Sequence, residues 1–94
     1  MDLSVVIVSY NTKQLLDDCL SSMVSGLKTA KIIAEVIVVD NGSKDGTREL
    51  LKKKYPGVVT VLNRKNVGFG RANNQGIRVA KGAHILLLNT DTVV

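Results

Sequence analysis

The chain has 94 residues, of which 45% are hydrophobic and 22% charged, with one Pro and eight Gly. This length suits a single domain with a modest core, and the composition excludes a disordered or low-complexity chain. The net charge is +5. We expect most of these charges to lie on solvated helix faces; the alternative is that they bind an anionic partner such as a nucleotide diphosphate or a membrane surface. Nucleic acid is not an expected partner, because no helix-turn-helix, zinc or RNP-type pattern occurs.

The first predicted element is a strand at residues 3–10, "LSVVIVSY". Such β-branched runs are typical of strands that are buried on both faces of a parallel sheet. A helix is predicted to follow over residues 11–26, with Asn11 or Thr12 as its cap. Its apolar face consists of Leu15, Leu16, Cys19, Leu20 and Met23. Because Cys19 is the single cysteine, an intrachain disulfide is excluded and a buried thiol is expected.

A second buried strand, "IIAEVIVVD", is predicted at residues 32–40. It contains the longest apolar run of the chain, which Glu35 interrupts and which is much shorter than the ~20 residues that a membrane-spanning helix needs. The loop "NGSKDG" then leads into a short helix at residues 47–55, with Asp45 as the predicted cap and Pro56 as the stop.

A third strand is predicted at residues 58–63 and a fourth at residues 84–89, with a loop and helix between them at residues 68–82. The expected inner face of that helix consists of Phe69, Asn73, Ile77 and Ala80. Strands that alternate with helices imply right-handed crossovers and a parallel sheet covered on both faces, so the predicted fold class is α/β.

Polar side chains follow every predicted strand at its carboxyl end, whereas the amino ends are unremarkable. In order along the chain they are Ser9, Tyr10 and Asn11; Asp40, Asn41, Gly42 and Ser43; Asn63, Arg64 and Asn66; and Asn89, Thr90 and Asp91. Ligands of open parallel sheets bind beyond the carboxyl ends of the strands. This edge is therefore the predicted functional site.

Two of these groups have specific chemistry. Asn89 and Asp91 place a side-chain oxygen at each end of a tripeptide, which suits Mg²⁺ or Mn²⁺ with a phosphate supplying further ligands; the alternative is an ordinary turn. Asp40 could accept hydrogen bonds from a base or ribose, could shape its own loop as an Asx turn, or could do both.

The segment "GFGRANNQG" combines glycines and asparagines at an expected helix start, where local propensity opposes the pattern. Arg71 could meet a phosphate or stack on a base. The alternative is close helix–strand packing at Gly70 and Gly76 with Arg71 in solvent. A dinucleotide-binding motif is excluded, because no glycine stands in the turn after the first strand.

Taken together, "VVIVSYN", "VIVVDNGSKDGT", "NVGFGRANNQGI" and "LLLNTD" resemble the inverting glycosyltransferases of the GT-A fold, of the family 2 type. The resemblance is strongest to bacterial rhamnosyltransferase-like members, which build cell-surface polysaccharide. It implies a Rossmann-like half domain whose parallel sheet has the strand order 3-2-1-4 with helices on both faces. It also implies a nucleotide-diphosphate sugar as donor and Mg or Mn as cofactor.

The resemblance also assigns roles to residues. Tyr10 matches the residue beside the base, Asp40 the acid that binds the base, and Asn89–Asp91 the D-x-D signature that holds cation and diphosphate. The residues expected to bind the nucleotide are Ser9, Tyr10, Asn11, Asp40, Asn41, Arg71, Asn74, Asn89 and Thr90. Asp91 and Asn89 are the expected metal ligands, and Asn89 departs from the usual first Asp.

The family's catalytic domain runs far beyond the D-x-D strand, so residues 1–94 are expected to be its N-terminal nucleotide-binding part. The catalytic base and the site for a saccharide or lipid-linked acceptor would lie in later residues, and the isolated chain is expected to transfer no sugar. A non-catalytic nucleotide-binding or interaction module is the alternative. Cytoplasmic localisation, or peripheral attachment to the inner face of the membrane, is expected, with self-association through Ile85–Leu88.

Overall fold

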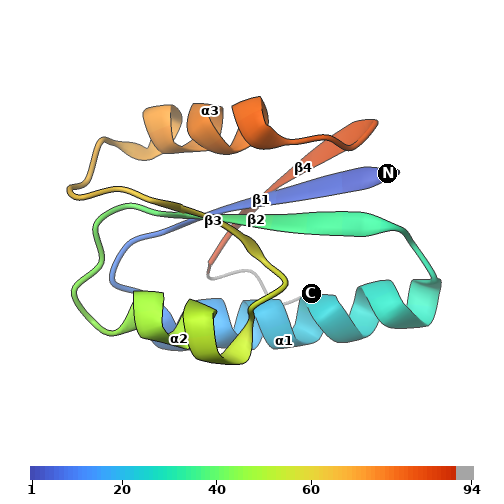
Figure 1. The fold of residues 1–94 in the computed structure, drawn as a ribbon, viewed down its shortest axis with the longest axis horizontal. Helices are drawn as coiled ribbons and strands as arrows, with labels where there is room; N and C mark the ends of the chain where they lie inside the picture. Colours follow the sequence, from blue (N-terminus) through green and yellow to red (C-terminus); the bar gives the residue numbers. More distant parts are fainter. Residues whose placement is uncertain (91–94) are drawn as a thin grey trace.

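The computed structural model describes residues 1–90, with Asn89 described by its backbone alone. Strands and helices alternate along the chain (Figure 1). The elements are β1 (Leu3–Ser9), α1 (Lys13–Ala30), β2 (Ala34–Asp40), α2 (Thr47–Lys54), β3 (Val59–Leu62), α3 (Phe69–Val79) and β4 (His84–Asn89). Each predicted strand and helix is therefore present, and Pro56 follows α2 as expected of a stop. The predicted end of the first helix at residue 26 was wrong, because α1 continues to Ala30.

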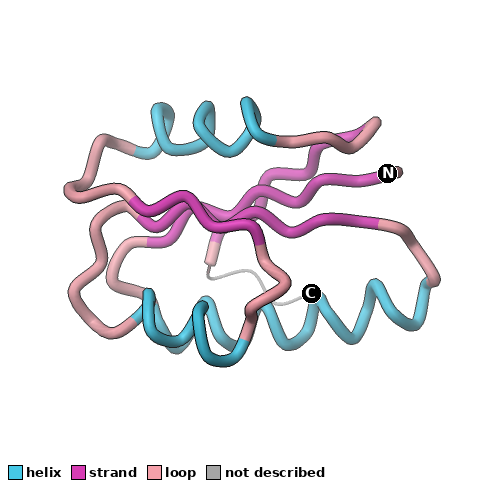
Figure 2. Tube along the Cα trace, in the orientation of Figure 1, coloured by secondary structure: helices cyan, strands magenta, loops and turns pink. Residues whose placement is uncertain are grey.

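The strands form one parallel sheet in the order β3-β2-β1-β4, as the resemblance implied. The register pairs Ser9 with Asp40, Asp40 with Leu62, and Val8 with Asn89. The strands consequently end close together. The loops after β1, β2 and β3 gather beyond these ends, at one end of the molecule (Figures 1 and 2).

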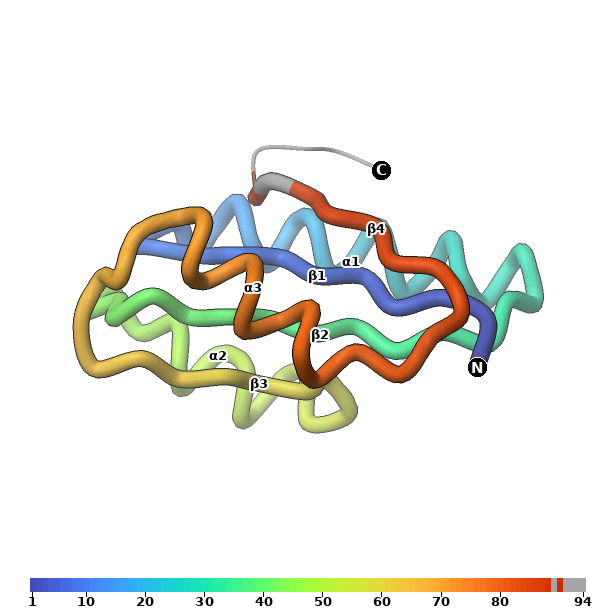
Figure 3. Tube along the Cα trace, turned by 90° about the horizontal axis from the view of Figure 1, so that it is seen from above, coloured from blue at the N-terminus to red at the C-terminus, as the bar shows by residue number. Residues whose placement is uncertain are grey.

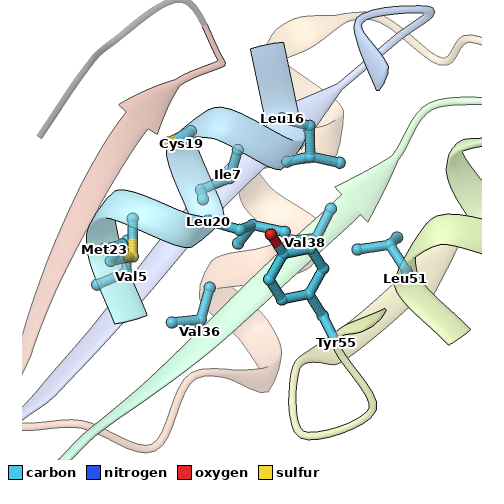
Figure 4. Packing of buried hydrophobic residues seen from close by; sticks show 10 residues of the cluster. All are labelled: Val5, Ile7, Leu16, Cys19, Leu20, Met23, Val36, Val38, Leu51 and Tyr55. Carbon is cyan, nitrogen blue, oxygen red and sulfur yellow. The ribbon is translucent and has the colours of Figure 1, made fainter. Parts of the chain in front are cut away.

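Helices α1 and α2 cover one face of the sheet and α3 covers the other (Figures 1 and 2). The larger core lies on the α1 and α2 side, and ten of its residues are drawn in Figure 4. Cys19 is buried there, and burial raises the pKa of its thiol. Leu15 was expected on the same face but is 45% exposed, because the inner face of α1 is centred on Leu16 and Leu20.

The core on the other face is thinner and consists of Val6, Val8, Ile37, Val39 and Ala72. Helix α3 lies close to the sheet because Gly76 has no side chain: a Cβ there would collide with Val6 Cγ1. Close packing was also considered for Gly70, but nothing lies within 4 Å of a Cβ at that position.

The predicted inner face of α3 was partly wrong. Its buried residues are Ala72, Asn73 and Gly76, whereas Phe69 and Ile77 are 58% and 38% exposed. The helix packs on its smallest residues, so its larger apolar residues lie at the flanks. Within residues 1–90, no helix combines the length and apolar character that crossing a membrane requires.

Candidate functional site

The loops after β1 and β2 are joined by reciprocal hydrogen bonds. The Asn11 N–H donates to Ser43 Oγ, and the Lys44 N–H donates to Asn11 Oδ1, each at 2.9 Å. Asn11 adopts a left-handed backbone with φ of 51°, a conformation that Asn tolerates better than most residues. Thr12 is the N-cap of α1, although its side chain makes no capping hydrogen bond. Asn11 therefore positions Tyr10, its neighbour, rather than capping the helix.

Asp45 links the starts of two helices. Its Oδ2 accepts a hydrogen bond from the Lys13 N–H at 3.0 Å, and its Oδ1 accepts from the Thr47 N–H at 3.2 Å. It lies one residue before the N-cap, Gly46, yet serves the first residue of α2 as a cap would. Partial burial acts to raise the pKa of Asp45, but the hydrogen bonds from Thr47 and Lys13 hold it below its ordinary value. The sequence indicated the contact with α2 and not the one with α1.

A network of side-chain amides connects the ends of β2 and β3 to the start of α3. Asn41, only 2% exposed, donates from Nδ2 to Asn66 Oδ1 at 2.9 Å and accepts at Oδ1 from the Val67 N–H at 3.0 Å. Asn63 donates to Asn41 Oδ1 at 3.2 Å and exchanges two hydrogen bonds with Gln75 on α3. Asn41 is a predicted nucleotide contact, and its hydrogen bonds also hold the loop before α3 in place.

Asp40 is fully buried at the end of β2. Arg48 Nε lies 3.4 Å from its Oδ2, and the Ser43 N–H lies 3.4 Å from its Oδ1. Arg48 also donates to the carbonyl oxygen of Asn63 at 2.6 Å. In this structure Asp40 therefore acts within its own loop, as the Asx-turn alternative predicted.

A hollow of about 250 Å³ opens at the carboxyl edge of the sheet. It is lined by Val8, Tyr10, Thr12, Asn41, Asn66, Phe69 and Thr90. Tyr10 and Phe69 are 48% and 58% exposed, so each presents part of a ring to solvent beside amide groups. A larger hollow of about 500 Å³ lies beside α2 and β3, and its lining combines the charged residues Arg48, Glu49 and Lys52 with apolar residues of α2 and β3. The smaller hollow is the better candidate for a polar ligand with a planar base.

The structure brings together some of the predicted site residues and separates others. Tyr10, Asn41 and Thr90 line the carboxyl-edge hollow. Arg71 and Asn74 line a different hollow of about 340 Å³ on α3, together with Val67, Gln75 and Arg78. Ser9 is buried below the hollow's rim, where its hydroxyl lies 3.2 Å from that of Thr12. Asn66 was predicted at this edge without a specific role, and Phe69, which also lines the hollow, was expected on the inner face of its helix instead.

The predicted metal ligands, Asp91 and the side chain of Asn89, lie outside the described residues. Among residues 1–90 no group of three or more His, Cys, Asp or Glu side chains forms a metal-binding cluster. Strand β4 nevertheless ends at Asn89, directly before Thr90, which lies on the lining of the carboxyl-edge hollow. Amide and carboxylate oxygens leaving the strand there are the donor types that Mg²⁺ and Mn²⁺ favour, so the residues fit such an ion chemically.

One buried amide in this region has no partner. Asn73 is 8% exposed, and its Oδ1 accepts no hydrogen bond from any described residue. Gln75, two residues later, faces Asn63 at the end of β3. Because two residues rotate a helix by about 200°, Asn73 lies on nearly the opposite side of α3 from Gln75, among the buried residues Ala72 and Gly76.

The profile of glycosyl transferase family 2 matches residues 4–94. The chain belongs to glycosyl transferase family 2. Among its relatives, the poly(ribitol-phosphate) beta-glucosyltransferase of Bacillus spizizenii is 37% identical over 98 residues, covering 100% of this chain and 15% of the relative. The glycosyltransferase GlyG of Streptococcus pneumoniae is 36% identical over 98% of this chain and 31% of its own length. The chain thus spans less than a third of these relatives.

Solved structures of glycosyltransferases share the fold. S. aureus TarS, residues 1–349, superposes with a TM-score of 0.80 at 26% identity, over 99% of this chain and 28% of that one. The mannosyltransferase PcManGT from Pyrobaculum calidifontis, in complex with GDP-Man and Mn²⁺, gives a TM-score of 0.79 at 25% identity, over 97% of this chain and 28% of that one. TarS has also been solved in complex with UDP. The α/β sheet of order 3-2-1-4 is accordingly that of glycosyltransferases in this family.

Proposed function

We propose that this chain is the donor-binding part of a glycosyltransferase that moves a sugar from a nucleotide-diphosphate sugar to a saccharide or lipid-linked acceptor in cell-surface polysaccharide synthesis. The observation that carries the proposal is the carboxyl-edge hollow between Tyr10 and Phe69, with Asn41 and Thr90 on its lining, in a family 2 chain. The names of similar proteins, which include TarS and a poly(ribitol-phosphate) glucosyltransferase, support the cell-surface assignment.

The base of the nucleotide would lie against Tyr10, whose exposed ring offers a stacking face. Asn41 and Asn66 supply amide groups at the same hollow. Asp40 would bind a base N–H only after exchanging its contact with Arg48, whose side chain is 41% exposed and can move into solvent. Similar structures in complex with UDP and with GDP-Man support a nucleotide ligand for this chain, while dTDP stays a prediction.

Asn89 and Asp91 would hold the divalent ion, with Mg and Mn both compatible with their oxygen atoms. The ion would supply positive charge to the diphosphate when bound. The Mn²⁺ in the mannosyltransferase structure supports a divalent ion in this family without deciding between the metals. A role for Arg71 beside the nucleotide stays a prediction, because Arg71 lines a separate hollow on α3.

This chain spans only 15% to 31% of the length of the relatives described above. We therefore propose that binding of the acceptor and transfer of the sugar depend on further polypeptide. The catalytic base and the acceptor site belong to that portion. The rhamnosyl specificity stays a prediction, since the similar proteins are named for glucosyl, N-acetylglucosamine and mannosyl chemistry. Self-association through Ile85–Leu88 and cytoplasmic localisation belong to the same proposal.

Calorimetric titration of the 94-residue chain tests the proposal. UDP with Mn²⁺ should bind, and Tyr10→Ala should weaken binding by about 5- to 150-fold, the range of one base–aromatic stack. Asp91→Asn should remove the dependence on Mn²⁺. Leu15→Ala, an exposed position on α1, is the matched control and should change nothing.

Four results would count against the proposal. Binding that Tyr10→Ala and Leu15→Ala affect equally would place the nucleotide elsewhere. Equal affinity for UDP with and without Mn²⁺ would show that the metal takes no part in nucleotide binding. Sugar release by the isolated chain would show that catalysis needs no further polypeptide. A chain that binds no nucleoside diphosphate would favour the alternative of a non-catalytic interaction module.

A further inference from the structure

Positive charge is segregated along this chain. Residues 50–90 contain eight Lys or Arg residues and no Asp or Glu. Three of the eight are Lys52, Lys53 and Lys54 on α2, and the others are Arg64, Lys65, Arg71, Arg78 and Lys81 on α3 and its flanking loops. All eight are exposed. Five of the eight therefore belong to α3 and its flanking loops, a segment that contains no acidic residue.

The cations of α3 lie on its outer surface. Arg71 and Arg78 line one hollow of about 340 Å³ with Asn74 and Gln75 between them in sequence. The opposite side of the helix, formed by Ala72, Asn73 and Gly76, is buried against the sheet. Helix α3 is the only described helix on this face, so its outer side faces solvent (Figures 1 and 3).

These charges have no acidic partner among the described residues. The ion pairs within residues 1–90 are Arg48 with Asp40 and Lys54 with Asp17, and both involve cations of α2. Lys81 is left out of the cations considered further, because an acidic group lies beside it: its backbone N–H donates to the Glu35 carboxylate at 2.6 Å. Arg71 and Arg78 on α3 remain, together with Arg64 and Lys65 in the loop before it, and we call these four residues the α3 basic face.

Apolar side chains accompany the α3 basic face. Ile77 and Val79 of the same helix are 38% and 41% exposed, whereas Phe69 belongs to the carboxyl-edge hollow. A surface that combines cations with exposed apolar groups fits the headgroup region of an anionic bilayer, which accepts both. A nucleic acid strand is favoured less, because Phe69 is the single aromatic side chain available for stacking on α3.

We propose that the α3 basic face docks on a bilayer that carries anionic phospholipids. Helix α3 lies along the sheet (Figure 3), so docking holds the strands parallel to the bilayer and leaves the carboxyl-edge hollow open at the side of the molecule. A lipid-linked acceptor would then meet the hollow close to the membrane. The inference stands on charge and exposure and does not require nucleotide binding.

Sedimentation with lipid vesicles tests the inference. The chain should bind vesicles in which about a third of the phosphatidylcholine is replaced by phosphatidylglycerol, and should bind pure phosphatidylcholine much more weakly, since each cation near an anionic surface contributes about a five-fold gain. Arg64→Gln with Arg78→Gln should weaken binding by about 10- to 30-fold. Lys52→Gln with Lys53→Gln removes the same charge from α2 and should weaken it less than about three-fold.

The control variants make the outcomes decisive. Equal losses in the two double variants would overturn the proposal, because net charge alone would then explain binding. Absence of binding to the anionic vesicles, or tighter binding to soluble heparin than to vesicles, would also overturn it. Circular dichroism checks that both variants fold. Vesicle binding without UDP binding would leave this inference standing while the proposed function failed.

Discussion

At the scale of single residues, Asn73 is the most unusual feature of the structure. Its Oδ1 is buried without a described hydrogen-bond partner, in a helix face otherwise made of Ala72 and Gly76. An unsatisfied buried polar atom costs about 1–3 kcal/mol. An asparagine that only filled space at this position would therefore lower the stability of the fold.

We predict that Asn73→Leu raises the free energy of unfolding by about 1–2 kcal/mol, because the uncompensated amide is removed and apolar contact is gained. Urea unfolding, with an unchanged m-value, is the measurement. Asn74→Leu, at the exposed neighbouring position, is the control and should give no gain. A loss of stability in Asn73→Leu would show that the amide bonds to a group beyond the described residues.

At the scale of elements, Glu35 joins three strands at the amino edge of the sheet. Glu35 is a residue of β2. It accepts one hydrogen bond from Ser4 Oγ of β1 and another from the N–H of Lys81, which precedes β4, each at 2.6 Å. Ser4 is buried, and its hydroxyl accepts in turn from the Gly82 N–H at 2.8 Å. The hydrogen bonds from Ser4 and Lys81 lower the pKa of Glu35.

A lowered pKa in the folded state means that Glu35 stabilises the fold above its unfolded pKa, and that this contribution is lost as the pH falls through the folded pKa. We predict that Glu35→Gln costs about 1 kcal/mol of unfolding free energy at neutral pH, after allowing for solvent screening. The cost should shrink below about pH 4, where the parent carboxylate also becomes protonated. Thermal unfolding across pH tests this, and a cost that is the same at every pH would show that shape rather than charge is responsible.

The elements also show what sequence can and cannot predict. Strands β1 and β2 follow from β-branched runs, because such runs have few other stable environments. The burial of Leu15 and Ile77 was misjudged, because helical periodicity does not specify how closely a helix approaches a sheet; Gly76 and Ala72 decide that for α3.

Polar pairing was harder to predict than strand order. The contact of Asn11 with Ser43 joins residues 32 positions apart, and that of Asn41 with Asn66 joins residues 25 apart. A sequence places such residues at the same edge of the sheet, which was predicted, but it does not say which amide meets which. For the same reason Asp40 could be assigned either to a base or to its own loop, and only the structure reveals the contact with Arg48.

At the scale of the whole molecule, the β4 edge carries apolar surface on both faces. Ile85, Leu86 and Leu87 are 44%, 44% and 48% exposed, and no described strand pairs with the outer side of β4. On the α1 side a mostly apolar hollow of about 250 Å³ is lined by Leu3, Val5, Met23, Gly26, Leu27, Leu86 and Leu88. An apolar edge with free backbone groups favours pairing with another strand.

We predict that the 94-residue chain associates through this edge at micromolar concentration. Burying about 600 Å² of apolar surface per chain would favour association by several kcal/mol after the entropic cost, at ~25 cal/mol per Å². Added salt should strengthen association, since it screens the repulsion between chains of net charge +5. Light scattering over a concentration series is the measurement.

The opposite edge of the sheet supplies the control for this prediction. Leu62 on β3 is 49% exposed, close to the value for Leu86 on β4, but β3 is a strand of four residues whose exposed positions include Thr60. Leu86→Lys should shift the chain to monomer, because pairing along β4 would bury the new charge. Leu62→Lys adds the same charge at the other edge and should leave association nearly unchanged. Equal effects of the two substitutions would mean that added charge alone keeps the chains apart, and a parent chain that stays monomeric at high micromolar concentration would mean that the β4 edge does not pair.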